Sequence, residues 1–166
     1  MILGHPFSRH DIQTSDPVPQ ADGLAVLRRQ GFRSTVATRA FHTGEIVFPV
    51  AGESTARPTR YTIQVAADRH VLTTCARFVN HNCGPNCRFD DAAMVFRALQ
   101  TIACGEEITF NYNTTEYDLA CPFRCHCGLP NCLGYVRGYK YLSPPDRERL
   151  ASLIPDHLRF MCGGRQ

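Results

Sequence analysis

The 166-residue sequence contains no long apolar run and no sustained tract of positive charge. Its first apolar stretch is three residues long and ends at Gly4, which is much shorter than the apolar core of a signal peptide. No later segment approaches the length of a membrane-spanning helix. We therefore expect a soluble intracellular protein, cytoplasmic or nuclear, that has no membrane partner.

Lysine is almost absent. Lys140 is the only one, arginine supplies nearly all of the positive charge, and the net charge is +3. Domains that bind nucleic acids directly usually gather their positive charge into clusters or stripes. We therefore expect no direct nucleic-acid binding, and the sequence carries no prediction of oligomeric state.

Internal repeats and low-complexity tracts are also missing, so the whole chain is the working unit. Hydrophobic residues make up 43% and charged residues 20%, which is typical of a folded globular chain. At this length we expect one principal hydrophobic core.

Short β-branched and aromatic segments separated by turns predict a mainly β fold with some helix and without βαβ units. The predicted strands are residues 45–50, 60–66, 71–74, 87–90, 93–99 and 107–110. Near the end, Ser143 can cap a short helix whose first turn holds Pro144 and Pro145. Its apolar side would contain Leu150 and neighbouring residues.

Cysteine is abundant, and the odd number of nine in an intracellular chain argues against a disulfide framework. Three of them, Cys125, Cys127 and Cys132, have the spacing C-x-C-x4-C in a segment rich in glycine and proline. Such a cluster predicts a structural zinc ion that lacks only a fourth ligand. Spacing leaves that ligand open, and buried free thiols are the alternative interpretation. The candidates for it are Cys121, His126, Cys83 and Cys87.

Three segments in order carry a family resemblance. They are RFVNHNCGPNC at 77–87, GEEITFNY at 105–112 and CHCGLPNC at 125–132. They resemble the two signature motifs of SET-domain methyltransferases and the zinc motif, called post-SET, that follows the domain. The resemblance extends from about Gly31 to Tyr141, about two thirds of the chain.

The resemblance implies a SET fold of several short sheets, in which the 105–112 segment threads beneath the loop holding residues 80–83 to form a pseudoknot. A zinc-stapled post-SET segment and a short C-terminal helix would follow. The expected organisation is a tail or irregular lead-in at 1–22, the SET domain at 23–113, the post-SET segment at 114–142 and a helical extension at 143–166.

The resemblance also implies the site residues. Cys83 would complete the zinc site with Cys125, Cys127 and Cys132. Asn80 and His81 would hold S-adenosylmethionine, and Tyr112 would be the catalytic tyrosine at the methyl-transfer pore. The family's glycine-x-glycine cofactor loop aligns with Phe32, Arg33 and Ser34, so both glycines are replaced, although Gly31 would restore one after a slip of one residue.

Each of these residues also has an interpretation without function. Asn80 can cap a turn, His81 can be a hydrogen-bonded core histidine, and Tyr112 can be aromatic packing. Their position inside two matching motifs favours the functional interpretation.

The function that the resemblance implies is transfer of a methyl group from S-adenosylmethionine to the side-chain amine of a protein lysine. Tyr112 and Tyr61 would line an aromatic channel that lowers the pKa of that amine. Only a few residues separate the 71–74 strand from Arg77, which leaves no room for a helical insert as a wall of a peptide groove. Two alternatives stay open, a small amine or amino acid as acceptor, and a SET-like zinc-binding interaction module with little catalysis.

Overall fold

The computed structural model describes residues 16–17, 21–29 and 31–163. Within these residues the chain is built mostly from short strands, and three short sheets of three strands each form its body. Two pairs of two-residue strands complete the β structure. The prediction of a mainly β fold of several short sheets is confirmed. Most of the predicted tail, residues 1–22, lies outside the described residues. Of its described part, Asp16–Pro17 pair with the next strand and Ala21 is buried in the core.

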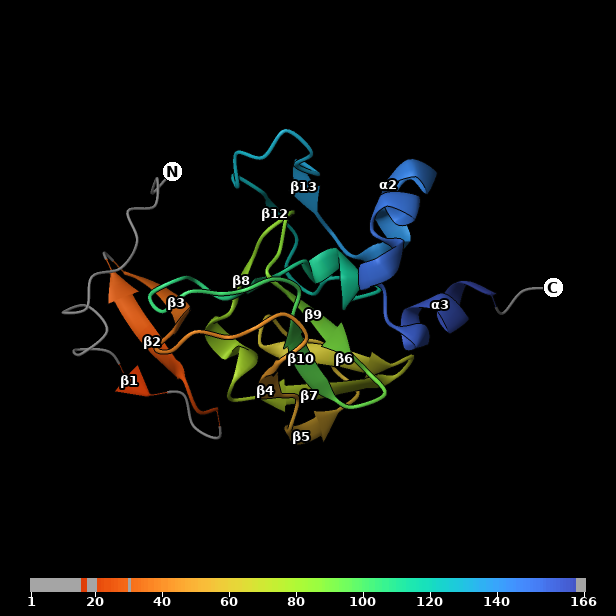
Figure 1. Cartoon of the computed structure of the whole chain (residues 1–166). Coiled ribbons are helices and arrows are strands. Elements are labelled where there is room, and N and C mark those ends of the chain that lie inside the picture. Colours follow the sequence, from red (N-terminus) through yellow and green to blue (C-terminus); the bar gives the residue numbers. More distant parts are fainter. Residues whose placement is uncertain (1–15, 18–20, 30, 164–166) are drawn as a thin grey trace.

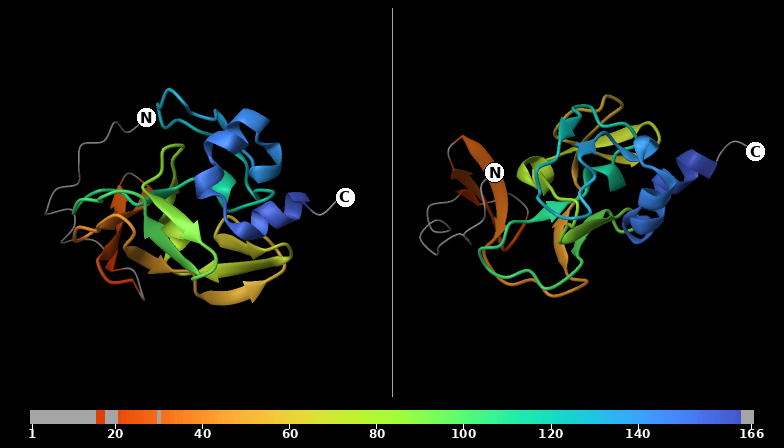
Figure 2. Two further views of the ribbon diagram at one scale, coloured as in Figure 1. Left: turned by 45° about the vertical axis from the view of Figure 1, so that its right-hand side comes forward. Right: turned by 90° about the horizontal axis from the view of Figure 1, so that it is seen from above.

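Each three-stranded sheet is antiparallel. In spatial order, the strands of the first sheet are β1 (Asp16–Pro17), β2 (Leu24–Arg29) and β3 (Phe32–Ala37). Those of the second sheet are β4 (Ile46–Pro49), β10 (Val95–Ala98) and β9 (Cys87–Asp90). Those of the third sheet are β5 (Gly52–Thr55), β7 (Arg69–Thr73) and β6 (Thr62–Ala66). Short connections join the antiparallel neighbours β2 and β3, β6 and β7, and β9 and β10. In the views of Figures 1 and 2, the first sheet lies on one side of the molecule and the C-terminal helices on the opposite side.

A single large core joins the sheets, as the composition predicts. At its centre Phe96 of β10 stacks between Phe48 of β4 and Phe89 of β9, with ring centroids 4.7 and 5.4 Å apart. Phe110 packs on the same Phe96 ring with its centroid at 4.7 Å. Offset aromatic packing of this kind adds to the free energy that burial of the rings contributes. Phe110 is thereby fixed two residues before Tyr112.

The predicted strand at 60–66 begins two residues late, at Thr62. Thr59 and Thr62 form a closed turn, in which the Thr62 hydroxyl donates to the Thr59 carbonyl at 3.0 Å and accepts from the Thr59 amide at 2.9 Å. Side chains that satisfy nearby backbone groups compete in this way with strand pairing. Arg60 and Tyr61 are consequently held outside the ladder, beside the strand that follows them.

The C-terminal extension holds two helices where the sequence predicts one. Helix α2 (Pro144–Arg149) begins as predicted, with the Ser143 hydroxyl accepting from the Asp146 amide, and a 3-10 turn η4 (Ala151–Leu153) follows it. Helix α3 (Asp156–Gly163) begins just after Pro155, which has no amide hydrogen to continue the preceding turn. A second small core holds these elements against the preceding segment; its buried members are Tyr139, Leu142, Leu150, Ile154 and Leu158.

Among the described residues, none of the helices has both the length and the apolar character that crossing a membrane requires.

Candidate functional site

The two predicted signature segments meet in a short parallel pair of strands, β8 (Asn80–His81) and β11 (Thr109–Phe110). Thr109 pairs with Asn80 and Phe110 with His81, and the Asn82 amide then donates to the Phe110 carbonyl at 3.1 Å. Parallel strands need a long connection, and here the chain between them forms β9 and β10 of the second sheet, which is called the central sheet below. The pairing brings the 77–87 and 105–112 segments side by side, as the family resemblance implies.

Tyr112 begins the 3-10 turn η2 (Tyr112–Thr114), and Asn111 alone separates this turn from β11. Its backbone amide donates to Nδ1 of His81 at 3.1 Å, and its hydroxyl donates to the carbonyl of Val79 at 2.7 Å. Burial raises the pKa of the Tyr112 hydroxyl well above its usual range, and the negative charges of Glu107 and Glu116 raise it further. The tyrosine therefore keeps its proton at physiological pH and is fixed at both ends.

His81 is a neutral imidazole at physiological pH, because burial lowers its pKa to about 4. Its Nδ1 accepts the Tyr112 amide, so the ring proton is on Nε2, which lies 3.4 Å from the sulfur of Cys83. His81 thus joins the tyrosine on one side to the cysteine cluster on the other. Phe123 of β12 (Phe123–Arg124) packs edge-on against both rings, at 5.7 Å from His81 and 5.9 Å from Tyr112.

Four cysteines form the predicted cluster. The sulfurs of Cys83, Cys125, Cys127 and Cys132 all lie within 4.8 Å of one another. Zinc–sulfur bonds of about 2.3 Å in a tetrahedron place neighbouring sulfurs roughly 3.8 Å apart. The sulfur of Cys83 lies 3.8 Å from that of Cys125 and 3.9 Å from that of Cys132, so the donor set and its spacing fit zinc.

Of the other candidates for the fourth ligand, Cys87 is buried in β9 and Cys121 is exposed beside Arg60. His126 is not part of the group that the described residues form. Cys83 follows β8, whereas the other three cysteines lie beyond residue 123, between β12 and β13 (Tyr135–Val136). The cluster therefore joins the C-terminal segment to the loop that carries His81.

The residues predicted at the cofactor are only partly brought together. The amide nitrogen of Asn80 donates to the Glu107 carboxylate at 2.7 Å, to the Arg33 carbonyl at 3.2 Å and to the Ser34 hydroxyl at 3.3 Å. Phe32 stands apart, with 69% of its surface exposed. All three residues of the 32–34 segment belong to strand β3, and the positive φ of 83° falls on Gly31 in the preceding turn.

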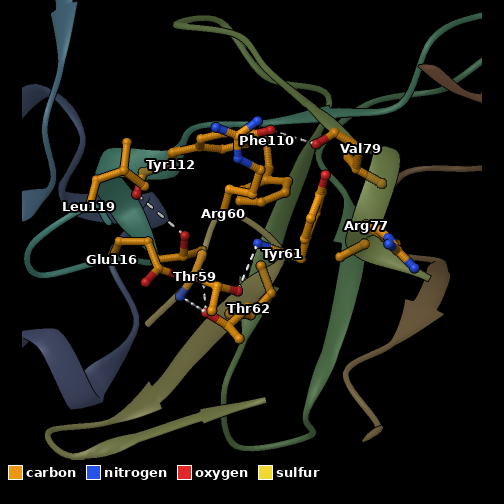
Figure 3. A pocket seen from close by; sticks show the side chains of 13 residues that line it. Thr59, Arg60, Tyr61, Thr62, Arg77, Val79, Phe110, Tyr112, Glu116 and Leu119 are labelled. Atoms are coloured by element: carbon orange, nitrogen blue, oxygen red, sulfur yellow. Dashed lines mark hydrogen bonds between the residues drawn. The ribbon is translucent and has the colours of Figure 1, made fainter. Parts of the chain in front are cut away.

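Tyr112 also lines a pocket, which Asn80 and the 32–34 segment do not line (Figure 3). Tyr61, Phe110 and Tyr112 supply its aromatic surface, and the guanidinium of Arg77 lies 4.8 Å from the centre of the Tyr61 ring. The empty space inside it, with its open mouth included, is about 370 Å³. The structure thus places the two predicted channel tyrosines in one pocket. The connection between β7 and β8 holds only the three-residue 3-10 helix η1 (Ala76–Phe78), so the predicted absence of an insert is confirmed.

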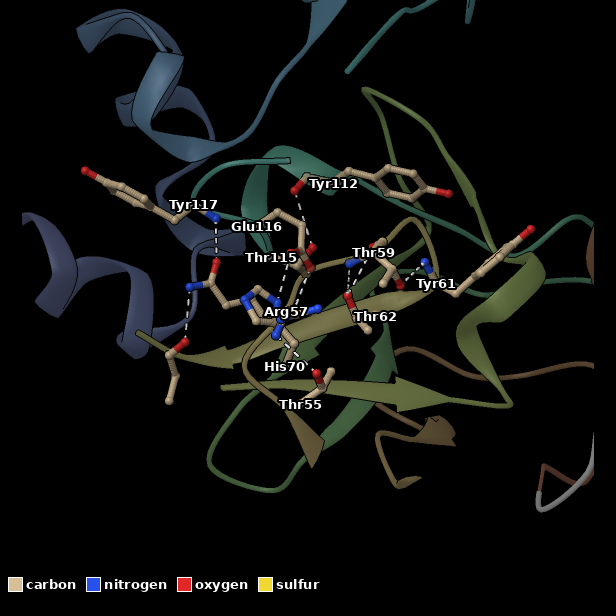
Figure 4. A network of polar contacts seen from close by, with 12 residues as sticks. Thr55, Arg57, Thr59, Tyr61, Thr62, His70, Tyr112, Thr115, Glu116 and Tyr117 are labelled. Carbon is tan, nitrogen blue, oxygen red and sulfur yellow. Dashed lines mark hydrogen bonds and ion pairs between the residues drawn. The ribbon is translucent and has the colours of Figure 1, made fainter. Parts of the chain in front are cut away.

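A buried polar network supports this pocket from below, and sequence reasoning missed it (Figure 4). The Glu116 carboxylate accepts a hydrogen bond from the backbone amide of Gln64 at 2.9 Å and lies 3.6 Å from Nδ1 of His70. The side chain of Gln64 in turn accepts from the Tyr117 amide at 2.7 Å. The amide of Glu116 also bonds to the Tyr112 carbonyl at 3.1 Å, so the network fixes η2 to the third sheet. Its partners are about fifty residues apart, and no local pattern reveals them.

Comparison with known proteins agrees with this geometry. Residues 33–113 match the family model described as the SET domain. The chain is similar to "Methyltransferase flvH" of Aspergillus flavus, with 32% identity over 91 residues that cover 54% of this chain and 50% of that protein. It is also similar to the "Histone-lysine N-methyltransferase, H3 lysine-36 specific" of Saccharomyces cerevisiae, with 34% identity over 102 residues, 58% of this chain and 13% of that protein. The chain therefore spans half or less of the length of these relatives.

Two solved structures share the fold. The methyltransferase domain of human histone-lysine N-methyltransferase SETMAR has a TM-score of 0.52 at 18% identity, over 67% of this chain and 56% of that one. KRYPTONITE, solved in complex with mCHG DNA and SAH, has a TM-score of 0.53 at 21% identity, over 68% of this chain and 28% of that one. At this level of identity the likeness establishes the fold.

Proposed function

Since residues 33–113 belong to the SET domain family, we propose that the chain is an S-adenosylmethionine-dependent methyltransferase that methylates the side-chain amine of a protein lysine. The observation that carries this proposal is the position of Tyr112, whose ring and hydroxyl lie between the Asn80–His81 strand and an aromatic pocket. The histone-lysine methyltransferases among the similar proteins, and the SAH bound in one structural neighbour, support it.

In this proposal Arg33, Ser34, Asn80 and His81 bind the cofactor, and Phe32 lies at the edge of that site. Bound S-adenosylmethionine supplies an electrophilic sulfonium methyl group. Asn80 is suited to orient a polar ligand because three acceptors, two of them on β3, surround its amide nitrogen and hold the side chain in one position. His81 contributes its backbone and is held in one ring orientation by Tyr112 and Cys83.

The pocket lined by Tyr61 and Tyr112 would bind the acceptor amine. A lysine amine must lose its proton before it can attack, which costs about 4.6 kcal/mol at pH 7 for a pKa of about 10.4. Aromatic walls remove water from the ammonium and lower its pKa, because desolvation disfavours the charged form. Alignment of the amine with the donor methyl group would supply much of the rate.

The four cysteines would hold one structural zinc ion. Four thiolate ligands complete its coordination and leave no position for a substrate. The role of the ion would be to hold Phe123 and the segment after it against His81, which closes the site from the C-terminal side.

A second candidate acceptor is a small amine or amino acid. The short β7–β8 connection favours it, because this side of the pocket lacks an insert along which a peptide would lie. A third candidate is an interaction module without catalysis, which the replacement of both cofactor-loop glycines by Phe32 and Ser34 favours.

The decisive experiment incubates the protein with methyl-labelled S-adenosylmethionine and cell extract and separates the products by size. We expect label in the protein fraction, absent when the protein is omitted. Label only in small molecules selects the second candidate. Titration calorimetry with the cofactor that detects no binding, together with no label in either fraction, selects the interaction module.

A further inference from the structure

The pocket beside Tyr112 has an uneven distribution of charge. Its charged lining residues are Arg60, Arg77 and Glu116. Figure 3 shows Arg77 and Glu116 on opposite sides of the pocket. Glu116 is buried, with 4% of its surface exposed, whereas both arginines are exposed. Negative charge therefore lies at the inner wall of the pocket and positive charge at its opening.

Neither arginine is neutralised by an acid. Among the residues that the structure describes, no carboxylate lies within ion-pair distance of Arg60 or Arg77. The guanidinium of Arg77 lies over the rings of Tyr61 at 4.8 Å and Phe78 at 5.6 Å, and that of Arg60 lies 4.0 Å from the Cys121 sulfur. By contrast, Arg39, Arg97 and Arg149 all pair with carboxylates. The two guanidinium groups at the opening are available to an anion.

The backbone at Arg60 and the side chain of Arg77 are both restrained. The Thr59–Thr62 turn keeps residue 60 out of the strand, and stacking on Tyr61 restricts the Arg77 side chain. A planar guanidinium fixed by stacking loses little freedom when it binds a carboxylate, and it can offer two parallel N–H donors. The two positive charges at the opening repel a basic peptide, because like charges within about 8–10 Å are only partly screened at physiological salt.

From this arrangement we infer that the acceptor carries a carboxylate close to the amine that is methylated, with the amine beside Tyr112 and the carboxylate at Arg60 and Arg77. The inference rests on the proposed function and names its substrate class. The carboxylate has two sources, the acid group of a free amino acid or an aspartate or glutamate beside a lysine in a peptide. In both cases the chemistry is the same. Solvent water takes the ammonium proton, the amine lone pair forms the N–C bond, the S–C bond of the donor breaks, and SAH leaves.

The test uses matched pairs of amines. Hexylamine and 6-aminohexanoate share an amine on a chain of the same length, and only the second has a carboxylate. Two lysine peptides, one flanked by aspartate and the other by arginine, form the second pair. Binding is measured by calorimetry, and methyl transfer by label from S-adenosylmethionine. We expect 6-aminohexanoate to exceed hexylamine, and the acidic peptide to exceed the basic one, at least about tenfold in affinity and in kcat/KM. A comparison of free lysine with the acidic peptide then shows whether the carboxylate comes from a free amino acid or from a peptide.

Variants assign the preference to the two arginines. Arg60→Gln and Arg77→Gln should each reduce the preference for the carboxylate-bearing member, and Arg77→Lys should retain part of it. The control is Arg69→Gln, an exposed arginine on the far end of β7 that does not line the pocket. It should leave the preference unchanged.

Failure of the inference and failure of the proposed function give different results. Methyl transfer to the basic peptide or to hexylamine that equals or exceeds transfer to the acidic partner overturns the inference and leaves the methyltransferase intact. Cofactor binding without transfer to any of these amines or to extract proteins overturns the proposed function. An unchanged preference in both glutamine variants also overturns the assignment to Arg60 and Arg77.

Discussion

At the scale of single residues, the hydroxyl of Tyr112 makes one well-defined hydrogen bond, to the Val79 carbonyl. Replacing it with phenylalanine keeps the ring but removes this donor to the Val79 carbonyl. We expect Tyr112→Phe to lower kcat on the order of 100-fold, the size of losing one well-placed donor in an active site. Cofactor affinity should persist, because Asn80 and the 33–34 backbone remain in place.

The measurement pairs methyl-transfer kinetics with calorimetry of S-adenosylmethionine binding. Tyr135→Phe, at an exposed tyrosine of β13, is the control and should change neither quantity. Stability of Tyr112→Phe should fall by about 1 kcal/mol from the lost hydrogen bond. Turnover equal to that of the unchanged protein would remove Tyr112 from the mechanism.

The same residue gives a prediction about alkaline pH. Burial raises the pKa of Tyr112 in the folded protein, whereas in the unfolded chain it ionises near the usual value of about 10. As the pH rises, Tyr112 therefore loses its proton in the unfolded state before it does so in the folded state. The stability that the Tyr112 hydroxyl contributes is complete below about pH 10 and declines as the pH rises above that value. Denaturation measured at increasing pH should show a shallower decline for Tyr112→Phe. Equal slopes would mean that Tyr112 ionises normally in the folded protein.

At the scale of elements, the turn between β13 and the 3-10 helix η3 (Tyr139–Tyr141) requires a glycine. Gly138 has φ of 113°, and an added Cβ would lie 2.7 Å from the Tyr117 carbonyl oxygen. The amide of Gly138 donates at 2.9 Å to the side chain of Asn113, which lies in the turn that Tyr112 begins. The turn at Gly138 thus fixes the position of η2.

We expect Gly138→Ala to cost about 2 kcal/mol or more, from backbone strain together with the clash. Gly44→Ala is the matched control, because Gly44 also has a positive φ, of 83°, but no neighbouring atom within 4 Å of an added Cβ. It should cost about 1 kcal/mol, the strain alone. Thermal denaturation of both variants provides the comparison, and equal losses would show that the close approach at Gly138 relaxes freely.

Helices and strands could be predicted from the sequence where interactions between nearby residues determine them, and not where contacts distant in the sequence do. The strand at 87–90 and the Ser143 cap were predicted at the residues where they occur, because alternation and capping act within a few residues. The late start of β6 depends on the Thr59–Thr62 turn, whose side-chain bonds compete with the ladder. The separate helix α3 depends on Pro155 together with a second small core, and packing of that kind is not visible in a local pattern.

The site divides in the same way. The motif residues Asn80, His81, Tyr112 and the four cysteines come together as the resemblance implies, although their roles remain proposals. The Glu116 network could not be predicted, because Gln64 and His70 reach it from the third sheet, about fifty residues earlier in the chain. The packing of Phe123 on His81 could not be predicted either, because it depends on how the cysteine cluster folds the chain back.

At the scale of the whole molecule, the cysteine cluster connects the signature loop at Cys83 to residues 125–132 of the C-terminal segment. The segment from 114 to 142 holds little of the main core, and β12 and β13 are two residues long each. Cys83 lies in the signature loop and contacts two of the C-terminal cysteines. A zinc ion at these four sulfurs would therefore assemble the cofactor side of the site while the three larger sheets fold without it.

Removing the ion should disorder the cofactor side of the site while the three larger sheets stay folded. Apparent zinc affinities of about 10–16 kcal/mol in small zinc modules suffice to order a segment of this size. We expect a strong chelator, or Cys127→Ser, to release about one zinc per chain and to abolish binding of S-adenosylmethionine, because Phe123 then loses its position against His81 and Tyr112. The stacked phenylalanines of the central sheet should keep their protection from hydrogen exchange.

Cys104→Ser is the control, since Cys104 is exposed and outside the cluster, and it should retain both zinc and cofactor binding. Zinc content by elemental analysis, cofactor affinity by calorimetry and exchange protection by mass spectrometry give three independent measurements. If chelation leaves cofactor affinity unchanged, the metal only stabilises the C-terminal segment. If it also removes protection from β4, β9 and β10, the sheets and the metal site fold as one cooperative unit, and the division into two parts is wrong.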